Sequence, residues 1–170
     1  MNFKAAVLTK TKKPLQIINN LNFPKLRRGQ VLVRVLHSAI CRSQIMEIEG
    51  KRGKDKYIPH LLGHEGSGIV EKIGKGVTKF LPGDKVFLSW IKGKGLDSDG
   101  TKIKRNRSII NAGPITTFSN YSIVSENRCF LIPKKFPIKK SVIFGCAVPT
   151  GVGIIINEIK PKKNDTICVI

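Results

Sequence analysis

Short apolar runs separated by glycine and proline fill the first two-thirds of the chain. Residues 3–8 form one such run, and residues 31–36 are apolar enough for a half-buried strand. The same pattern predicts strands within 63–76 and over 85–89, 117–124 and 128–132. Many short strands joined by glycine and proline turns are typical of a compact β-barrel, so we expect a mainly β architecture.

Three segments interrupt these strands. Residues 43–49 have the length of one or two helical turns, with Ser43 as the candidate N-cap. Residues 50–57 form a charged loop. Residues 92–107 are basic, contain glycine and hold almost no large apolar side chains, which predicts a long surface loop.

The pattern changes near the C-terminal end. The apolar spacing becomes helical over 139–159, with an interruption at 145–153. Residues 166–170 then predict a buried strand of the kind that opens a parallel α/β unit. Because one buried strand cannot complete a sheet, we expect the sequence to stop near the first strand of a second domain. The expected domains are therefore 1–140 and an incomplete one over 141–170.

Composition limits the class of protein. The chain has 170 residues, 41% of them apolar, which is enough to build a packed core. It has no apolar run long enough for a membrane span, and its N-terminus lacks the apolar centre of a signal peptide. The four cysteines form no C-x-x-C pair. We therefore expect no membrane partner and a reduced, cytoplasmic location.

The net charge of +20, from 31 Lys and Arg against 11 Asp and Glu, suggests nucleic acid as one partner. However, the basic residues are scattered, and the longest basic runs are pairs such as Arg27-Arg28. Aromatic residues make up only 6% of the chain, which is few for stacking on bases. A lysine-rich solvated surface is the better interpretation, and a nucleic acid partner is not expected.

Three motifs could carry chemistry together. Cys41 lies in ICRSQ, His64 in GHEGSG and Cys146 in GCAVPTG. Two thiolates and one imidazole are a known ligand set for catalytic zinc, with the fourth position left open for substrate. The wide separation of the three residues excludes a zinc finger and favours a site where several loops converge.

The motifs also carry a resemblance. AAVL, CRSQ, LLGHEGSGIVEKIGKGVT, PGDKV, TTFSNYSIV and GCAVPTGVG follow one another as in zinc-dependent medium-chain dehydrogenases, the alcohol dehydrogenase family. The resemblance implies a GroES-like β-barrel over 1–140. It also implies the helix and first strand of a doubly wound nucleotide-binding domain over 141–170. NAD or NADP would be the cofactor, and the full-length protein would form homo-oligomers.

Site residues follow from this resemblance. It implies that Cys41, His64 and Cys146 hold one catalytic zinc ion. Glu65 matches the acidic neighbour that sits behind the metal, and Ser43 matches the hydroxyl that takes the alcohol's proton.

The resemblance also assigns residues to the cofactor and substrate. Arg42 matches a position that contacts the cofactor pyrophosphate, and Thr150 matches one near the nicotinamide. Trp90 and Phe118 match positions that line the substrate pocket. The alternative for these two is the role of ordinary core aromatics.

Some residues depart from the family pattern. Gln44 replaces the usual Asp that orients the zinc-bound histidine, and Met46 replaces the histidine that ends a proton relay in some members. Residues 92–107 correspond to a lobe that holds four cysteines around a structural zinc in many members, and here they contain none. The expectation is thus one catalytic zinc and no structural zinc.

The remaining cysteines and histidines receive structural roles. Cys129 and Cys168 lie in apolar segments, so we expect buried thiols. His37 and His60 match no ligand of the family, and both are assigned to structure.

The leading interpretation is an enzyme that transfers hydride between an alcohol or aldehyde and NAD(P), and that is active only at full length. A glutathione adduct, a sugar and a simple alcohol all stay open as substrates. The main alternative is a non-catalytic module whose cationic surface binds an acidic partner or nucleic acid. A zinc-free reductase is a third, disfavoured by the complete ligand set.

Overall fold

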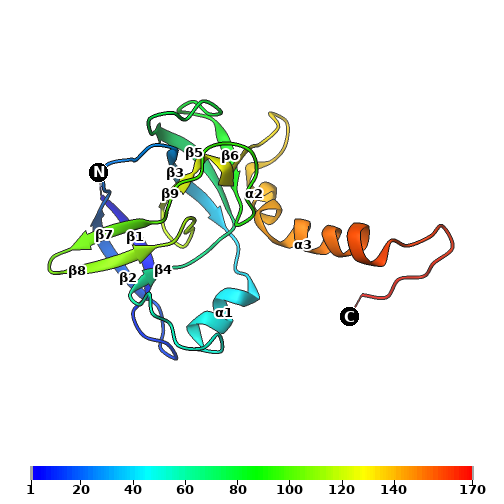
Figure 1. The fold of residues 1–170 in the computed structure, drawn as a ribbon, viewed down its shortest axis with the longest axis horizontal. Coiled ribbons are helices and arrows are strands. Elements are labelled where there is room, and N and C mark those ends of the chain that lie inside the picture. The colour runs from blue at the N-terminus through cyan, green and yellow to red at the C-terminus, as the bar shows by residue number, and fades with distance from the viewer. Residues whose placement is uncertain (1, 170) are drawn as a thin grey trace.

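The fold comes from a computed structural model that describes residues 2–169. Within them the strands form two five-stranded sheets that curl toward each other as a barrel (Figure 1). The first sheet has the order β2-β1-β4-β8-β7, with bounds Gln16–Asn22, Asn2–Leu8, His60–Leu61, Ser108–Ala112 and Thr101–Arg105. The second has the order β10-β6-β5-β3-β9, with bounds Cys129–Leu131, Lys85–Leu88, Gly66–Ile73, Gln30–Ser38 and Tyr121–Ser125. The mainly β prediction is confirmed.

Each sheet contributes one apolar cluster to the interior. In β3 and β5 the inward side chains are mostly valines, including Val31, Val33 and Val70, each at most 1% exposed. In the other sheet Phe3 and Val7 of β1 pack with Ile103 and Ile110 of the β7–β8 hairpin. These buried side chains form the core, and burial in β3 is continuous over its first four residues rather than alternating.

Helix α1 (Arg42–Ile48) follows β3 and lies at the lower end of the molecule in Figure 1. It begins one residue earlier than predicted, with Cys41 at the N-cap position and without a side-chain cap. The expectation that Ser43 caps this helix is therefore wrong. This shift places Cys41 at the N-terminal end of the helix, shortly after the chain leaves β3.

The surface-loop prediction for 92–107 is wrong in its second half. Residues 101–105 form β7, which pairs antiparallel with β8 from Thr101↔Ala112 to Arg105↔Ser108. Ile103 is the one apolar residue in the TKIKR sequence of β7, and it is buried at 3% exposure. One apolar position cannot produce a recognisable alternation, so the partner strand decides this element.

The C-terminal part is helical: α2 (Ile138–Ser141), the 3₁₀ segment η2 (Val142–Gly145), α3 (Ala147–Gly153) and the π-helix η3 (Ile154–Ile159). A second 3₁₀ segment, η1 (Glu126–Arg128), joins β9 to β10. Figure 1 shows α3 extending away from the barrel. No single helix within 2–169 has the length and hydropathy of a membrane span, and one pair bent by 54° qualifies only when its members are combined.

The strand predicted over 166–170 is not formed in the described part of this segment. Residues 166–169 pair with no strand there, and Ile170 lies outside the described residues. Cys168 is exposed, which corrects the prediction of a buried thiol, whereas Cys129 is fully buried as predicted. A strand needs hydrogen bonds from a neighbour, and apolar composition alone does not supply one.

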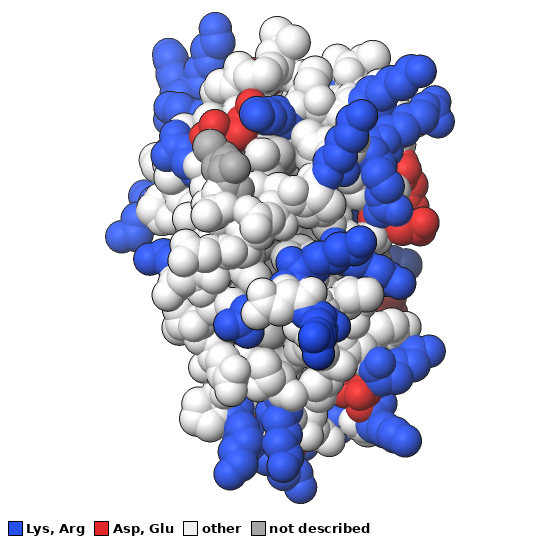
Figure 2. Space-filling model, turned by 90° about the vertical axis from the view of Figure 1, so that its left-hand side faces the viewer, with Lys and Arg blue, Asp and Glu red and all other residues white. Residues whose placement is uncertain are grey.

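Figure 2 shows how the positive charge lies on one face of the molecule. Lys and Arg side chains gather in several separate groups along its rim and across its middle, with uncharged surface and a few acidic side chains between the groups. On this face the cations do not merge into one continuous patch, which agrees with a solvated lysine-rich surface.

Candidate metal centre

Four potential ligands from distant parts of the sequence meet beside α1. Cys41, His64, Glu65 and Cys146 each place one ligand atom within 4.8 Å of the others. Cys41 ends the connection from β3, His64 and Glu65 lie between β4 and β5, and Cys146 separates η2 from α3. The structure thus brings together the three residues predicted as ligands and their acidic neighbour.

Two glycines allow this close approach. Gly63 has φ +90°, and a Cβ atom there would lie 2.8 Å from the backbone nitrogen of Phe118. A Cβ on Gly145 would lie 2.6 Å from the Cβ of Glu65. Each glycine directly precedes a predicted ligand, so the chain can bring His64 and Cys146 against neighbouring backbone only because these positions lack side chains.

Hydroxyl groups hold the backbone around the ligands. Ser89 donates a hydrogen bond of 2.7 Å to the carbonyl of Gly145, and Thr117 donates one of 3.0 Å to the carbonyl of Glu65. Ser38 donates to the same Glu65 carbonyl at 3.2 Å. The sequence analysis missed these three residues. Their signal is weak: Ser38 and Ser89 are polar residues that end apolar strands, and Thr117 precedes Phe118 in the TTFSN motif.

The two thiols have the separation that one metal ion requires. Cys41 Sγ and Cys146 Sγ lie 4.0 Å apart, and two thiolates on one tetrahedral zinc would be about 3.8 Å apart. Burial alone would raise the pKa of Cys41, but polar contacts with Ser43 and the Cys146 thiol outweigh it and lower that pKa. Burial and the nearby Cys41 raise the pKa of Cys146. The Cys41 thiol therefore loses its proton more readily than the Cys146 thiol.

His64 can adopt the tautomer that a metal ligand requires, with Nδ1 protonated and Nε2 free. Its Nδ1 lies 2.9 Å from Nε2 of the Gln44 amide, while its own Nε2 is buried without a partner. Turning this amide by 180° brings Gln44 Oε1 to Nδ1, where it accepts the Nδ1 proton and leaves the Nε2 lone pair of His64 free. Burial also lowers the pKa of His64, which favours the neutral imidazole. These donors fit zinc, because an orphaned imidazole nitrogen and two soft sulfurs suit that ion.

Glu65 is the fourth member of the cluster, and one of its carboxylate oxygens has no hydrogen-bond partner. Its side chain is 3% exposed, and Oε2 makes no hydrogen bond. Burial raises its pKa, opposed by a hydrogen bond from the backbone N–H of Ala147. A buried carboxyl of this kind can approach a cation or hold a proton, which agrees with a position behind the metal.

Comparison with known proteins decides the family. Residues 27–134 match the family described as "Alcohol dehydrogenase GroES-like domain". The chain belongs to this family. It is 28% identical to alcohol dehydrogenase class-3 of Caenorhabditis elegans over 99% of this chain and 50% of the relative. It is 29% identical to S-(hydroxymethyl)glutathione dehydrogenase of Escherichia coli over 99% of this chain and 52% of that protein.

Solved structures agree with this assignment. Benzyl alcohol dehydrogenase from Acinetobacter calcoaceticus matches with a TM-score of 0.77 and 26% identity, over 94% of this chain and 49% of its own. An alcohol dehydrogenase zinc-binding domain protein from Burkholderia ambifaria matches with a TM-score of 0.79 at 23% identity, which shows the fold alone. The chain spans about half the length of these relatives.

In this GroES-like domain, the residues assigned to the cofactor stand at the edge of the cysteine pair. Arg42 directly follows Cys41 and is exposed. Thr150 lies on α3 with its Oγ1 4.0 Å from Cys146 Sγ, and it is exposed as well. Ser43 is partly buried, and its hydroxyl oxygen has no hydrogen-bond partner. All three are therefore close in sequence or space to a sulfur of the candidate centre.

The two predicted pocket aromatics have different surroundings. Phe118 is half-buried and packs against Gly63, next to His64. Trp90 is 50% exposed, and its carbonyl accepts a hydrogen bond from Arg128. Phe118 therefore lies beside the cluster, whereas Trp90 is not the buried core aromatic of the alternative interpretation.

Proposed function

We propose that this chain is the metal-binding half of a zinc-dependent oxidoreductase that transfers hydride between an alcohol or aldehyde and NAD(P) in the cytoplasm. The observation that carries the proposal is the convergence of Cys41, His64, Glu65 and Cys146 within 4.8 Å. Cys41, His64 and Cys146 would hold one zinc ion, and the absence of cysteine from 92–107 leaves no four-cysteine structural site. When bound, the ion supplies Lewis-acid polarisation of the substrate oxygen.

The chain's own residues prepare the reaction around that ion. Gln44 holds the ring of His64 through a contact of 2.9 Å between its Nε2 and His64 Nδ1, and with its amide turned so that Oε1 takes this place it would accept the Nδ1 proton and fix the tautomer. Ser43, one residue past the helix start, takes the proton that leaves the alcohol and passes it to solvent. Arg42 and Thr150 bind the cofactor at the exposed side of the two sulfurs.

The substrate class stays a choice among three: a glutathione adduct, a sugar or polyol, and a simple alcohol. The E. coli relative is an S-(hydroxymethyl)glutathione dehydrogenase by name. Gln44 in place of the usual Asp and the cysteine-free 92–107 segment argue against a close member of that branch. Phe118 and Trp90 are the residues proposed to shape the substrate pocket.

A metal analysis of the full-length protein tests the zinc site. Cys146→Ser should remove the metal and abolish turnover, because the open site then has one sulfur and one nitrogen left. Cys168→Ser is the matched control, since that thiol is exposed and outside the cluster. Retention of zinc by the Cys146 variant would overturn the proposed ligand set.

Ser43→Ala tests the proton-transfer role separately from metal binding. Turnover should fall by about a hundredfold, the lower end for general acid–base catalysis, while the zinc content stays at one per chain. Equal turnover with chemistry rate-limiting would assign the proton to another group.

The chain of residues 1–170 should transfer no hydride when assayed alone. Hydride transfer needs the nicotinamide held at near-attack distance, and only Arg42 and Thr150 of the proposed cofactor contacts lie in this chain. Zinc-loaded chain assayed with NAD and simple alcohols should therefore form no NADH. Clear turnover would show that the cofactor binds elsewhere.

A further inference from the structure

A second group of potential ligands lies apart from the cysteine cluster. Glu47 of α1, Asp55 of the charged loop and His60 of β4 place their ligand atoms within 4.8 Å of one another. His60 Nε2 is 2.7 Å from Asp55 Oδ2 and 3.7 Å from Glu47 Oε1. The sequence analysis assigned His60 to structure, because it matches no ligand of the family.

The orientation of His60 is that of a metal ligand. Its Nδ1 lies 2.9 Å from the carbonyl oxygen of Leu61, and a carbonyl can only accept, so Nδ1 carries a proton. Metal-binding histidines donate their second ring N–H to a carbonyl or carboxylate in this way. Nε2 is consequently the atom that faces Asp55 and Glu47.

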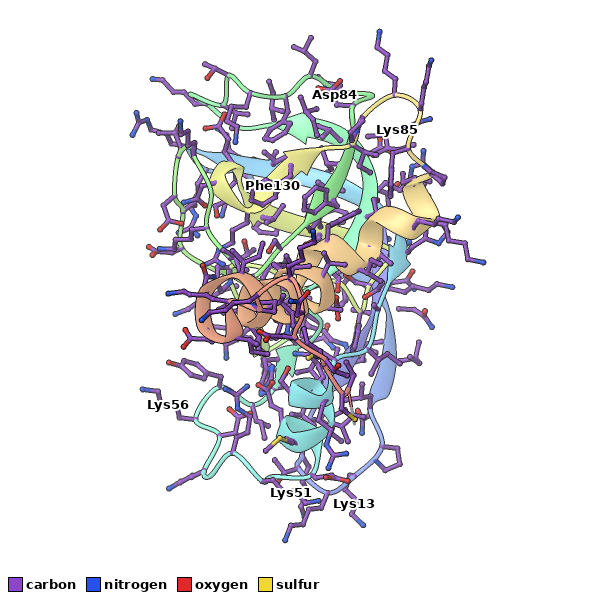
Figure 3. The ribbon with its side chains drawn as sticks, turned by 90° about the vertical axis from the view of Figure 1, so that its right-hand side faces the viewer. Lys13, Lys51, Lys56, Asp84, Lys85 and Phe130 are labelled. Carbon is purple, nitrogen blue, oxygen red and sulfur yellow. The ribbon has the colours of Figure 1, made fainter. Side chains whose placement is uncertain are left out.

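No lysine or arginine neutralises the two carboxylates by direct contact. His60 is the only partner within ion-pair distance of Glu47 or Asp55 in residues 2–169, although Arg52, Lys54 and Lys56 line a neighbouring pocket with them. The side chain of His60 is 9% exposed, and that of Asp55 is 13% exposed. Figure 3 shows Lys51 and Lys56 of the same loop pointing outward at the periphery. Two carboxylates and one imidazole nitrogen thus face one another without a basic side chain between them.

A pocket of about 660 Å³ adjoins the cluster and offers an entry path. Glu47 and His60 line it, and so does Gln44. Gln44 is 5% exposed, and its Oε1 has no hydrogen-bond partner; turning the amide so that Oε1 meets His64 leaves Nε2 without one instead. A buried amide atom without a partner indicates a polar occupant, such as water around an ion. The pocket therefore has room for the waters that a three-ligand site needs.

We propose that Glu47, Asp55 and His60 form a second divalent-cation site, which takes an ion such as Zn²⁺ or Co²⁺ with water as the remaining ligands. One nitrogen and carboxylate oxygens suit these ions. Binding forms a bond between the ion and His60 Nε2, and a proton on that nitrogen goes to solvent. The ion exchanges through the pocket, so it differs from a single zinc retained through purification.

Cobalt distinguishes the two sites by their spectra. Co²⁺ added to the metal-free chain should first give the intense near-ultraviolet absorption of thiolate ligands, from the cysteine cluster. A second equivalent should bind without adding to this absorption, because its ligands contain no sulfur. A Cys41→Ser, Cys146→Ser double variant should lose the thiolate absorption and still bind one Co²⁺ by calorimetry.

Glu47→Gln separates ion binding from a merely structural role of His60. The His60–Asp55 hydrogen bond does not need Glu47, so the variant should keep its unfolding midpoint, while its affinity for the second Co²⁺ falls at least about tenfold. Glu49→Gln is the matched control, because Glu49 pairs with Lys51 at 2.8 Å and lies outside the cluster. The proposal is overturned if the cysteine-free variant binds no Co²⁺, or if Glu47→Gln and Glu49→Gln bind it equally.

Discussion

His60 begins β4 and His64 lies in the connection that follows this strand, yet the two side chains have different chemical surroundings. His60 is buried against two carboxylates, with Asp55 Oδ2 2.7 Å from its Nε2. His64 faces an uncharged amide, and its Nε2 has no partner beside two sulfurs. The second environment favours a neutral ring, because burial lowers the pKa of His64. Identical side chains thus become a partner of two carboxylates and a proposed ligand of a soft metal because of what the rest of the chain places around them.

The glycine between these histidines should give the largest effect. Gly63→Ala adds a Cβ at φ +90°, 2.7 Å from a ring carbon of Phe118 and close to the Thr117 hydroxyl. We expect a loss of about 3 kcal/mol or more in unfolding free energy, from backbone strain and overpacking together. Both histidine environments should be disturbed.

Urea denaturation of Gly53→Ala provides the comparison for this loss. Gly53 has φ +86° but nothing within 4 Å of a Cβ, so only the backbone strain of about 1 kcal/mol should appear. Equal losses in the two variants would show that the close approach at Gly63 contributes nothing.

The next largest effect concerns Gln44 and the metal. Gln44→Leu removes the acceptor for the Nδ1 proton of His64, and zinc affinity should fall ten- to a hundredfold, about 1.4–2.7 kcal/mol. Gln44→Asp should instead tighten binding, because it supplies a charged acceptor. Competition with a chromophoric chelator measures both, and Ile45→Leu, at a 40% exposed position, is the control. A Leu variant with unchanged affinity would separate Gln44 from the metal.

Stability against pH should separate the two clusters in the metal-free chain. Burial lowers the pKa of His64 in the folded chain below its usual 6.5, so at acidic pH the unfolded chain binds a proton that the folded chain does not. The contribution of His64 to the free energy of unfolding is therefore present above pH 6.5 and is lost as the pH falls through the pKa of the folded state. Burial alone would raise the pKa of Asp55, but hydrogen bonds from Tyr57 and His60 outweigh it and lower that pKa from 3.8. Its contribution is present above 3.8 and is lost only as pH falls below it.

The pH dependence of unfolding free energy, compared between variants of the two clusters, tests these two pH ranges. Urea unfolding against pH should show that His64→Gln removes the dependence just below 6.5, while Asp55→Asn removes only the more acidic part. The raised pKa of Glu65, caused by burial, acts with the opposite sign and stays in both variants. Identical curves for the two variants would contradict the distinction between the clusters.

The smallest effect belongs to the surface near these clusters. Lys51 and Glu49 form an exposed pair at 2.8 Å, and Lys51→Gln should leave both the unfolding midpoint and the zinc affinity unchanged. Thermal unfolding with and without zinc measures this. A clear shift in either quantity would mean that the loop charges act on the ligand clusters.

The sequence by itself determined the barrel and the cysteine cluster. Short apolar runs predicted strands such as β3 and β6, since alternation depends on local composition. Cys41, His64 and Cys146 were found because motifs in the order of a known family surround them. The family match over 27–134 then agreed with that resemblance.

Only the tertiary structure decided the remaining features. Strand β7 forms because β8 lies beside it, and residues 166–169 stay unpaired although they are apolar. Glu47, Asp55 and His60 meet only when α1, the charged loop and β4 pack together. The physical reason is common to all three cases: hydrogen bonds between strands and contacts between charges depend on distance in space, and neither composition nor spacing along the chain encodes that distance locally.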